Sequence, residues 1–130
     1  MLRRLLLALV VVVFWGCSSD RGNGVGSGAD GGVGLGKTAA IVVTPDPISF
    51  STTEVGNTTE VVVTIRNSAN PDLPESADLK LQTPYIKNNS SDFSLTQPEQ
   101  MVVPPGESTT MKVIYTPSDA KYDSDFLVID

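Results

Sequence analysis

Few of the residue types that catalyse reactions or hold metals occur in this 130-residue sequence. It has no histidine, which removes the commonest general base and the commonest metal ligand. The single cysteine, Cys17, excludes an internal disulfide, a thiolate zinc cluster and a redox pair. Neither a Ser-His-Asp nor a Cys-His mechanism can be assembled within the chain. We therefore expect no catalytic residue, no metal site, no cofactor and no enzymatic activity.

One stretch matches a nucleotide-binding motif by its letters. Residues 31–38 (GGVGLGKT) begin at Gly31, end at Thr38 and fit the phosphate-binding loop pattern GxxxxGK[ST]. Such a loop needs a buried strand before it and a helix that starts at the Lys-Thr pair, whose amides hold phosphate. Here SGADGG precedes the match and the β-rich AAIVVTP follows it. A glycine-rich tract produces such matches by chance, and we expect no nucleotide binding.

The remaining chemical candidates are acidic and aromatic. Asp119, Asp123 and Asp125 could be imagined as calcium ligands, but a calcium cage needs about six to eight oxygens. A solvated loop and strand edge in an acidic chain is the simpler interpretation. Tyr85 and Tyr115 could stack on a ligand; we expect Tyr115 to lie in the core instead, and Tyr85, beside Pro84, is left open.

Charge narrows the class of partner. The chain carries 9 basic and 15 acidic residues, a formal net charge of −6. Arg3 and Arg4 lie in the predicted export signal, so its removal takes the net charge to −8. Nucleic-acid binding needs a basic surface that displaces condensed counterions, and adhesion to anionic lipid needs one too. We expect neither kind of binding.

The first sixteen residues have the order of an export signal. Arg3 and Arg4 form a positive start, and residues 5–15 are an unbroken apolar stretch. A helix of that length rises about 16 Å at ~1.5 Å per residue. The hydrocarbon core of a membrane is about 30 Å thick, so the stretch is too short to span it.

The signal ends at Gly16-Cys17, which resembles the lipobox of bacterial lipoproteins. In that family a small residue precedes a cysteine that is lipidated and becomes the new N-terminus. Phe14 and Trp15 depart from the pattern, which usually has Leu and a small residue there. An ordinary cleaved signal with an incidental cysteine therefore stays open. We predict lipidation of Cys17, with acyl chains such as palmitate holding the protein on the membrane.

The sequence divides into three parts: a lipoprotein signal peptide over residues 1–16, a flexible tether over 17–38 and one domain over 39–130. The tether is dominated by Gly, Ser, Asp and Asn and cannot bury enough apolar surface to order itself. Its mean reach is about 25 Å, at ~5–6 Å × √n for n residues.

From residue 39 onward, turn signals recur every few residues between short β-branched runs, which predicts an all-β sandwich. Strands are expected at residues 41–44, 48–51, 60–67, around 79–86, 92–95, 102–103, 110–116 and 122–130. In the closing strand we expect Tyr122, Ser124, Phe126 and Val128 to point inward. The expected core is Ile41, Val43, Ile48, Phe50, Val61, Val63, Ile65, Leu79, Leu81, Phe93, Leu95, Met111, Val113, Tyr115, Phe126 and Val128.

These segments carry a family resemblance. IVVTPDPISF, VGNTTEVVVTIRNSAN, DFSL and VPPGESTTMKVIYTPSDAKYDSDFLVI are similar to the hydin-like, abnormal-spindle type immunoglobulin domain, also described in bacterial surface proteins as "choice-of-anchor D". The family pattern falls on residues 43–50, 55–56, 63–67, 92–93 and 105–117. The resemblance implies an immunoglobulin-like antiparallel β-sandwich that acts as an adhesive, scaffolding or spacing module.

We expect a non-catalytic, lipid-anchored binding or structural module of the bacterial cell envelope. The outer membrane, on its periplasmic or surface face, is the expected location, and the partner is an unidentified protein or glycan. The alternative is the N-terminal spacer of a larger envelope enzyme or surface adhesin, since family members usually run past the equivalent of Asp130. A two-domain pilus-type chaperone is a third, more distant alternative. A reading frame that continues beyond Asp130 would favour the spacer.

Overall fold

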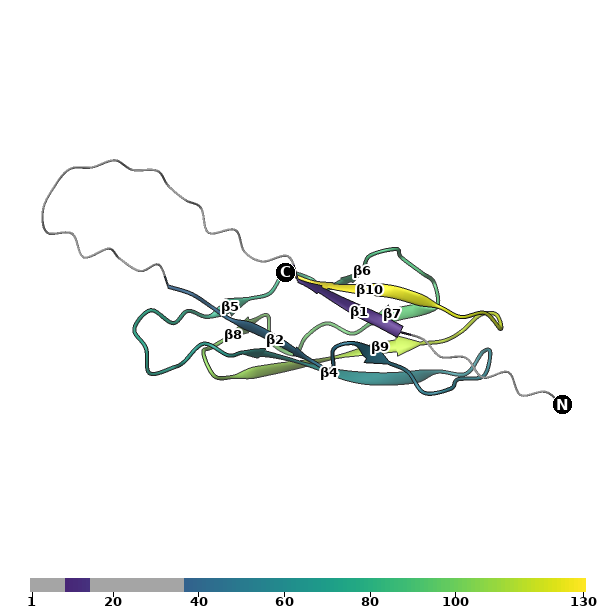
Figure 1. Cartoon of the computed structure of the whole chain (residues 1–130), viewed down its shortest axis with the longest axis horizontal. Helices are drawn as coiled ribbons and strands as arrows, with labels where there is room; N and C mark the ends of the chain where they lie inside the picture. Colours follow the sequence, from purple (N-terminus) through teal and green to yellow (C-terminus); the bar gives the residue numbers. More distant parts are fainter. Residues whose placement is uncertain (1–8, 15–36) are drawn as a thin grey trace, which may run out of the picture.

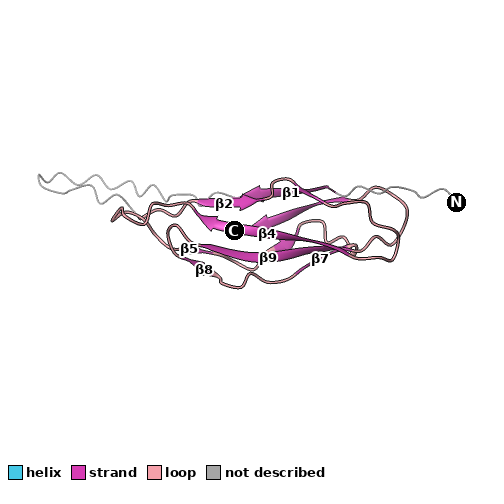
Figure 2. Ribbon diagram, turned by 90° about the horizontal axis from the view of Figure 1, so that it is seen from below, coloured by secondary structure: helices cyan, strands magenta, loops and turns pink. Residues whose placement is uncertain are grey.

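The computed structural model describes residues 9–14 and 37–130, and within them every regular element is a strand (Figures 1 and 2). The same residues contain no helix that is long and apolar enough to cross a membrane. The expected all-β class is confirmed for this part of the chain. The strands are β1 (Leu9–Phe14), β2 (Ile41–Thr44), β3 (Ile48–Ser49), β4 (Thr59–Asn67), β5 (Leu79–Lys80), β6 (Tyr85–Ile86), β7 (Phe93–Leu95), β8 (Val102–Val103), β9 (Ser108–Tyr115) and β10 (Ser124–Ile129).

Two four-stranded sheets and a short ribbon make up the fold. One sheet has the order β2-β4-β9-β7 and is antiparallel throughout. The other has the order β3-β1-β10-β6, and in it β1 runs parallel to β10. The sandwich expected to be wholly antiparallel therefore contains one parallel pairing. The ribbon β5-β8 lies toward one end of the molecule (Figure 1).

The longest pairing, between β4 and β9, follows the alternation in the sequence. The register runs from Thr59 opposite Tyr115 to Arg66 opposite Ser108. Side chains of a strand alternate between its two faces, so the Val-Val-Val-Thr-Ile run must send every second residue inward. Val63 and Ile65 are fully buried, whereas Arg66 is exposed. The predicted inward face of this strand is confirmed.

The core between the sheets contains most of the predicted residues. Val61, Leu79, Leu95 and Ile41 are only partly buried but pack against it. The buried cluster consists of Val43, Ile48, Phe50, Val63, Ile65, Leu81, Phe93, Val103, Met111, Val113, Tyr115, Leu127 and Ile129.

The predicted register of the closing strand β10 is wrong. Phe126 was expected inward but is 37% exposed, while its neighbour Leu127 is fully buried and Ile129 is 1% exposed. Tyr122 and Ser124, also expected inward, are exposed, whereas Val128, the fourth residue expected inward, is buried and only 6% exposed. The physical reason is Asp125, whose buried carboxylate accepts backbone hydrogen bonds and so fixes the odd-numbered residues as the inner face.

The turn that leads into β9 depends on a left-handed glycine. Glu107 N donates to Pro104 O over 3.1 Å, and Gly106 has a φ of 81° at the third position of this turn. A proline followed by a glycine with positive φ is typical of a type II turn. The sequence Pro104-Pro105-Gly106-Glu107 therefore forms the turn between β8 and β9.

The predicted export signal and tether fall largely outside the described residues. This holds for Cys17 and for residues 1–8 and 15–36. Within the predicted signal, however, Leu9–Phe14 forms β1, which pairs with β3 on one side and lies beside β10 on the other (β1 and β10 are labelled in Figure 1). A segment expected to take no part in the fold of the mature protein thus completes a sheet in the full-length chain.

Candidate functional site

The end of the phosphate-loop match has the geometry of a sheet edge. Residues 31–36 lie outside the described part of the chain, but Lys37 and Thr38 are described. Thr38 N donates to Glu75 O over 2.7 Å, and Thr38 O accepts from Ala77 N over 2.9 Å. A phosphate loop would begin a helix here, with free amides toward the anion. Thr38 instead bridges to Ser76, and β2 follows.

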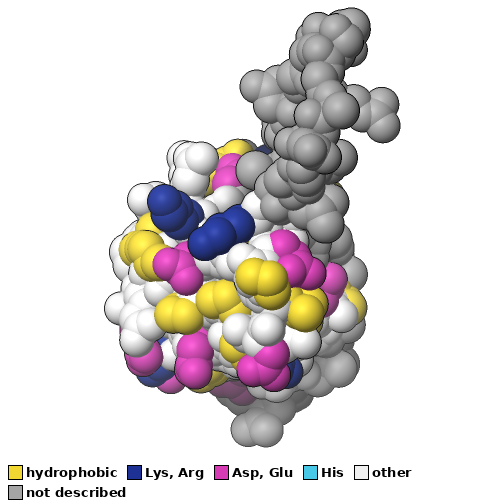
Figure 3. All heavy atoms as spheres, turned by 90° about the vertical axis from the view of Figure 1, so that its left-hand side faces the viewer, with side chains coloured by type: hydrophobic (Ala, Val, Ile, Leu, Met, Phe, Trp, Pro, Cys, Tyr) yellow, Lys and Arg dark blue, Asp and Glu magenta, His cyan; other side chains and the backbone are white. Residues whose placement is uncertain are grey.

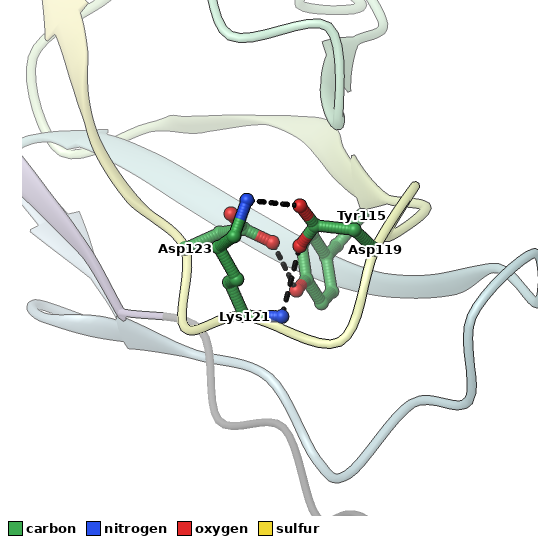
Figure 4. Close-up of polar contacts among 4 residues, drawn as sticks. All are labelled: Tyr115, Asp119, Lys121 and Asp123. Atoms are coloured by element: carbon green, nitrogen blue, oxygen red, sulfur yellow. Dashed lines mark hydrogen bonds and ion pairs between the residues drawn. The ribbon is translucent and has the colours of Figure 1, made fainter.

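The loop between β9 and β10 brings four polar residues together (Figure 4). The buried Tyr115 hydroxyl donates to Asp123 Oδ2 over 2.7 Å. Lys121 Nζ pairs with Asp119 Oδ2 over 2.7 Å, and the Lys121 amide donates to Asp119 Oδ1 over 2.8 Å. The hydrogen bonds from Lys121 lower the pKa of the exposed Asp119 carboxyl. Each carboxylate therefore has its own donor, and the cluster holds the loop.

The ring of Tyr115 belongs to the core, as the sequence predicted. It stacks on Phe93 with ring centroids 4.9 Å apart, and Phe50 lies 5.4 Å from it. Burial raises the pKa of the Tyr115 hydroxyl far above its usual value, and the hydrogen bond to the Asp123 carboxylate raises it further. Such a hydroxyl stays protonated and anchors the loop to the core.

Asp125 is the third acidic residue that the sequence singled out, and it has a separate role. It is 2% exposed, and its carboxylate accepts from Asn88 N over 2.9 Å and from Ser90 N over 3.3 Å. Between these donors Asn89 adopts a left-handed φ of 55°. Asp125 thus closes the turn after β6. In the described ranges no three His, Cys, Asp or Glu side chains are placed to hold a metal ion.

Asn67, at the end of β4, joins four segments of the chain. It is fully buried, and its Oδ1 accepts from Ala40 N over 3.1 Å and from Ala69 N over 3.2 Å. Its Nδ2 donates to Ala77 O over 2.8 Å and to Val103 O over 3.0 Å. All the hydrogen bonds that this amide can readily make are used. Sequence reasoning placed Asn67 in the family pattern but missed its role as a hub.

Within the described part of the chain, no buried side-chain nitrogen or oxygen lacks a hydrogen-bond partner. An active site usually keeps reactive groups available to a substrate in a cleft. Tyr115, Asp123, Asp125 and Asn67 are instead committed to one another or to the backbone. The polar side chains that were candidates for catalysis or ligand binding therefore stabilise loops instead.

Aromatic side chains are exposed on one surface, which is the best candidate for binding. Tyr122 is 58% exposed, Tyr85 51% and Phe126 37%. Tyr85 pairs with Val128 across β6 and β10, and the Lys87 Nζ lies 5.4 Å from the centre of the Phe126 ring. We call Tyr85, Lys87 and Phe126 the outer aromatic face; Tyr122 lies in the loop that precedes β10.

Other parts of the surface are more mixed. At the end of the molecule shown in Figure 3, hydrophobic side chains are interspersed with acidic ones. Aromatic residues are enriched where proteins meet partners, because they bury a large area at little entropic cost. The outer aromatic face has this composition. Only Tyr85 among its members was considered as a ligand contact from the sequence, because the wrong register placed Phe126 inside.

Two packed sheets, a buried aromatic cluster and loops held by side-chain hydrogen bonds define an immunoglobulin-like module. Residues 39–129, more than half of the chain, match the model of the ASH family, described as abnormal spindle-like microcephaly-associated, ASPM-SPD-2-Hydin. The chain belongs to this family, and the hydin-like resemblance is confirmed. The family is a non-enzymatic type of domain. A search of curated proteins and a search of solved structures each found no match.

Proposed function

We propose that this chain is a non-catalytic binding or scaffolding module, held on the outer membrane of a bacterium by lipid on Cys17. The observation that carries the binding role is the contrast between its interior and its surface. Buried polar groups in the described residues all have internal partners, while Tyr85 and Phe126 remain exposed on one face of the β10-β6 pair. Such a surface suits recognition of a protein or glycan better than chemistry on a substrate.

The anchor rests on the sequence. The apolar stretch of residues 5–15 ends directly at Gly16-Cys17, and no other cysteine occurs in the chain. Two or more acyl chains give stable membrane attachment, at about 0.8 kcal/mol per buried CH₂. The tether of residues 17–38 then holds the domain about 25 Å from the headgroups.

Lipidation is tested by mass spectrometry of the protein isolated from bacterial membranes. We expect a mature N-terminus at Cys17 that carries acyl chains. Cys17→Ser should give an unprocessed or soluble species. An unmodified Cys17 in protein that is soluble without detergent would overturn the anchor and leave the binding role to be judged separately.

The binding face is tested by a photoreactive phenylalanine placed at Tyr85 in living cells. Val62, on the outer face of the other sheet, is the matched control, since Tyr85 is 51% and Val62 is 52% exposed. We expect a discrete cross-linked product from position 85 and none from position 62. Equal cross-linking at both positions, or none at either, would contradict the assignment of the face.

A further inference from the structure

The position of β1 in its sheet has a consequence for the mature protein. β1 pairs with β10 over six residues, from Leu9 opposite Ser124 to Phe14 opposite Ile129. On its other side it pairs with β3, where Leu9 lies opposite Ser49 and Val10 opposite Ile48. One strand therefore fills the whole space between β3 and β10. Neighbouring strands lie about 4.8 Å apart, so the space without β1 is roughly 10 Å wide.

The edge of β10 that faces β1 is identified by the hydrogen bonds on the opposite edge. Phe126 O accepts from Lys87 N, and Asp130 O accepts from Gln82 N, each over 2.8 Å. Backbone groups of successive residues in a strand point to alternate edges. The N–H and C=O groups of Leu127 and Ile129 therefore point toward β1.

The last four residues of β10 do not protect that edge once β1 is absent. Natural edge strands are guarded by lysine, proline, an inward-pointing charge or a bulge against pairing with other chains. The last four residues of β10 are Phe126, Leu127, Val128 and Ile129, which carry no charge, whereas Asp125 near its start is buried and hydrogen-bonded to the amides of Asn88 and Ser90. On the two sides of the space, Ile48 and Leu127 are fully buried core residues. A strand in this position closes the core as well as the sheet.

We propose that this edge is a strand-acceptor site, which binds an extended, uncharged, β-branched segment donated by another polypeptide. The donated strand pairs in parallel with β10 and antiparallel with β3. The chemistry of the occupant follows from Leu9–Phe14, whose sequence LVVVVF is the one that the structure places there. The inference rests on the proposed removal of residues 1–16, which takes β1 out of the mature protein.

Recognition at this site comes chiefly from the backbone. Addition of a strand to an open sheet edge gains main-chain hydrogen bonds, and the side chains of alternate residues give specificity. An apolar sequence without charge is required because the space opens onto the core, where an unpaired charge is costly. A flexible, Gly-rich or acidic segment does not meet this requirement.

The test starts from the full chain, in which β1 is in place, with a protease site introduced among residues 22–28. After cleavage, Leu9–Phe14 is no longer joined to the domain and can be exchanged. The probe is a fluorescent peptide of LVVVVF flanked by two lysines at each end for solubility. The control peptide has proline at the position of Val12, which removes an N–H donor and cannot extend a ladder. The two peptides carry equal charge.

We expect saturable binding of the probe after cleavage, at least about tenfold weaker binding of the proline peptide, and no binding to the uncut chain. Amide hydrogen exchange shows where on the domain the probe peptide binds. The bound probe should protect the amides of Leu127 and Ile129 more than that of Val128, which faces β6. Because only the peptides differ, the folding of the chain is the same in both arms.

Three results would overturn the proposal: no saturable binding, equal binding of the two peptides, or protection at β2 or β7 instead of β10. Dimerisation of the cut chain that protects Leu127 and Ile129 without peptide would also overturn it, since a second copy would then fill the site. The failure of lipidation at Cys17 is a separate outcome. It is read by mass spectrometry and leaves the peptide measurements unchanged.

Discussion

Replacement of Asn67 by Asp changes one atom at the most connected buried side chain of the domain. The new Oδ2 takes the place of Nδ2, 2.8 Å from Ala77 O and 3.0 Å from Val103 O. The ionised carboxylate would lose both donated hydrogen bonds and face two carbonyl oxygens. Each buried group left unsatisfied costs about 1–3 kcal/mol, so the variant should lose about 2–6 kcal/mol near pH 7. A domain of this size has about 5–14 kcal/mol in total.

The effect of Asn67→Asp depends on pH, with a sign that follows from the contacts. A protonated carboxyl can donate to one of the two carbonyls, so the folded state favours the protonated form and raises the pKa of the introduced group. The unfolded chain releases that proton near pH 4. The free energy of unfolding that the variant loses relative to the wild type is therefore smallest below pH 4. This loss grows as the pH rises through the folded-state pKa of the introduced carboxyl, by up to ~1.4 kcal/mol per pH unit.

Urea unfolding of the full chain, followed by circular dichroism at pH 4 and pH 7, measures this difference. The control is Asn70→Asp, an exposed position where Oδ1 accepts from Asp72 N over 3.0 Å and which keeps that acceptor after the change. Asn70→Asp should stay within about 0.5 kcal/mol of the wild type. If Asn67→Asp behaves like Asn70→Asp at both pH values, the donor contacts of Asn67 do not stabilise the fold.

Three further predictions concern the core, the tyrosine anchor and the glycine-rich match. Leu127→Ala should cost about 2–5 kcal/mol and lower Tm by roughly 10 °C or more, whereas the half-exposed Phe126 should tolerate alanine much better; the reverse order would refute the register. Tyr115→Phe should cost about 1.5–3 kcal/mol at pH 7. Because the Tyr115 pKa is raised on folding, its contribution is present below pH ~10 and lost above it, so the phenylalanine variant should lack this alkaline loss in melts. Millimolar ATP with Mg²⁺ should leave Tm unchanged, and Lys37→Ala should not change Tm either. A saturable, ATP-dependent shift of Tm would instead support a nucleotide site at residues 31–38.

The sequence was sufficient to predict the inward face of strands whose two faces differ in polarity. In β4 the run from Val61 to Asn67 alternates between apolar and polar side chains near its end, and only one register buries Val63 and Ile65. Turn chemistry was equally direct, since Pro105 followed by Gly106 permits few backbone conformations. These features depend on near neighbours in the sequence, so they could be predicted without the fold.

The closing strand shows where that reasoning fails. Phe126, Leu127, Val128 and Ile129 are all apolar, so alternation alone is compatible with either face. The register depends on Asp125, which is charged and would be placed outside by any rule based on polarity. Its burial is stabilised by the amides of Asn88 and Ser90, which lie far away in the sequence. The role of Asn67 as a hydrogen-bonding hub was missed for the same reason, because its partners come from segments that only the fold brings together.

The proposed strand acceptor links export to stability. In the proposed processing, a signal peptidase cleaves the bond before Cys17, so Leu9–Phe14 would leave with the signal and could not stay on β10. The mature domain would then arrive in the envelope with one edge open, and β3 would have lost its only neighbour in that sheet. A ligand that binds only the folded state stabilises it by about 2.7 kcal/mol at a free concentration of 100 Kd. The Tm of the mature chain should therefore rise with the concentration of the strand donor, whereas the uncut full-length chain, which carries its own β1, should show no such dependence.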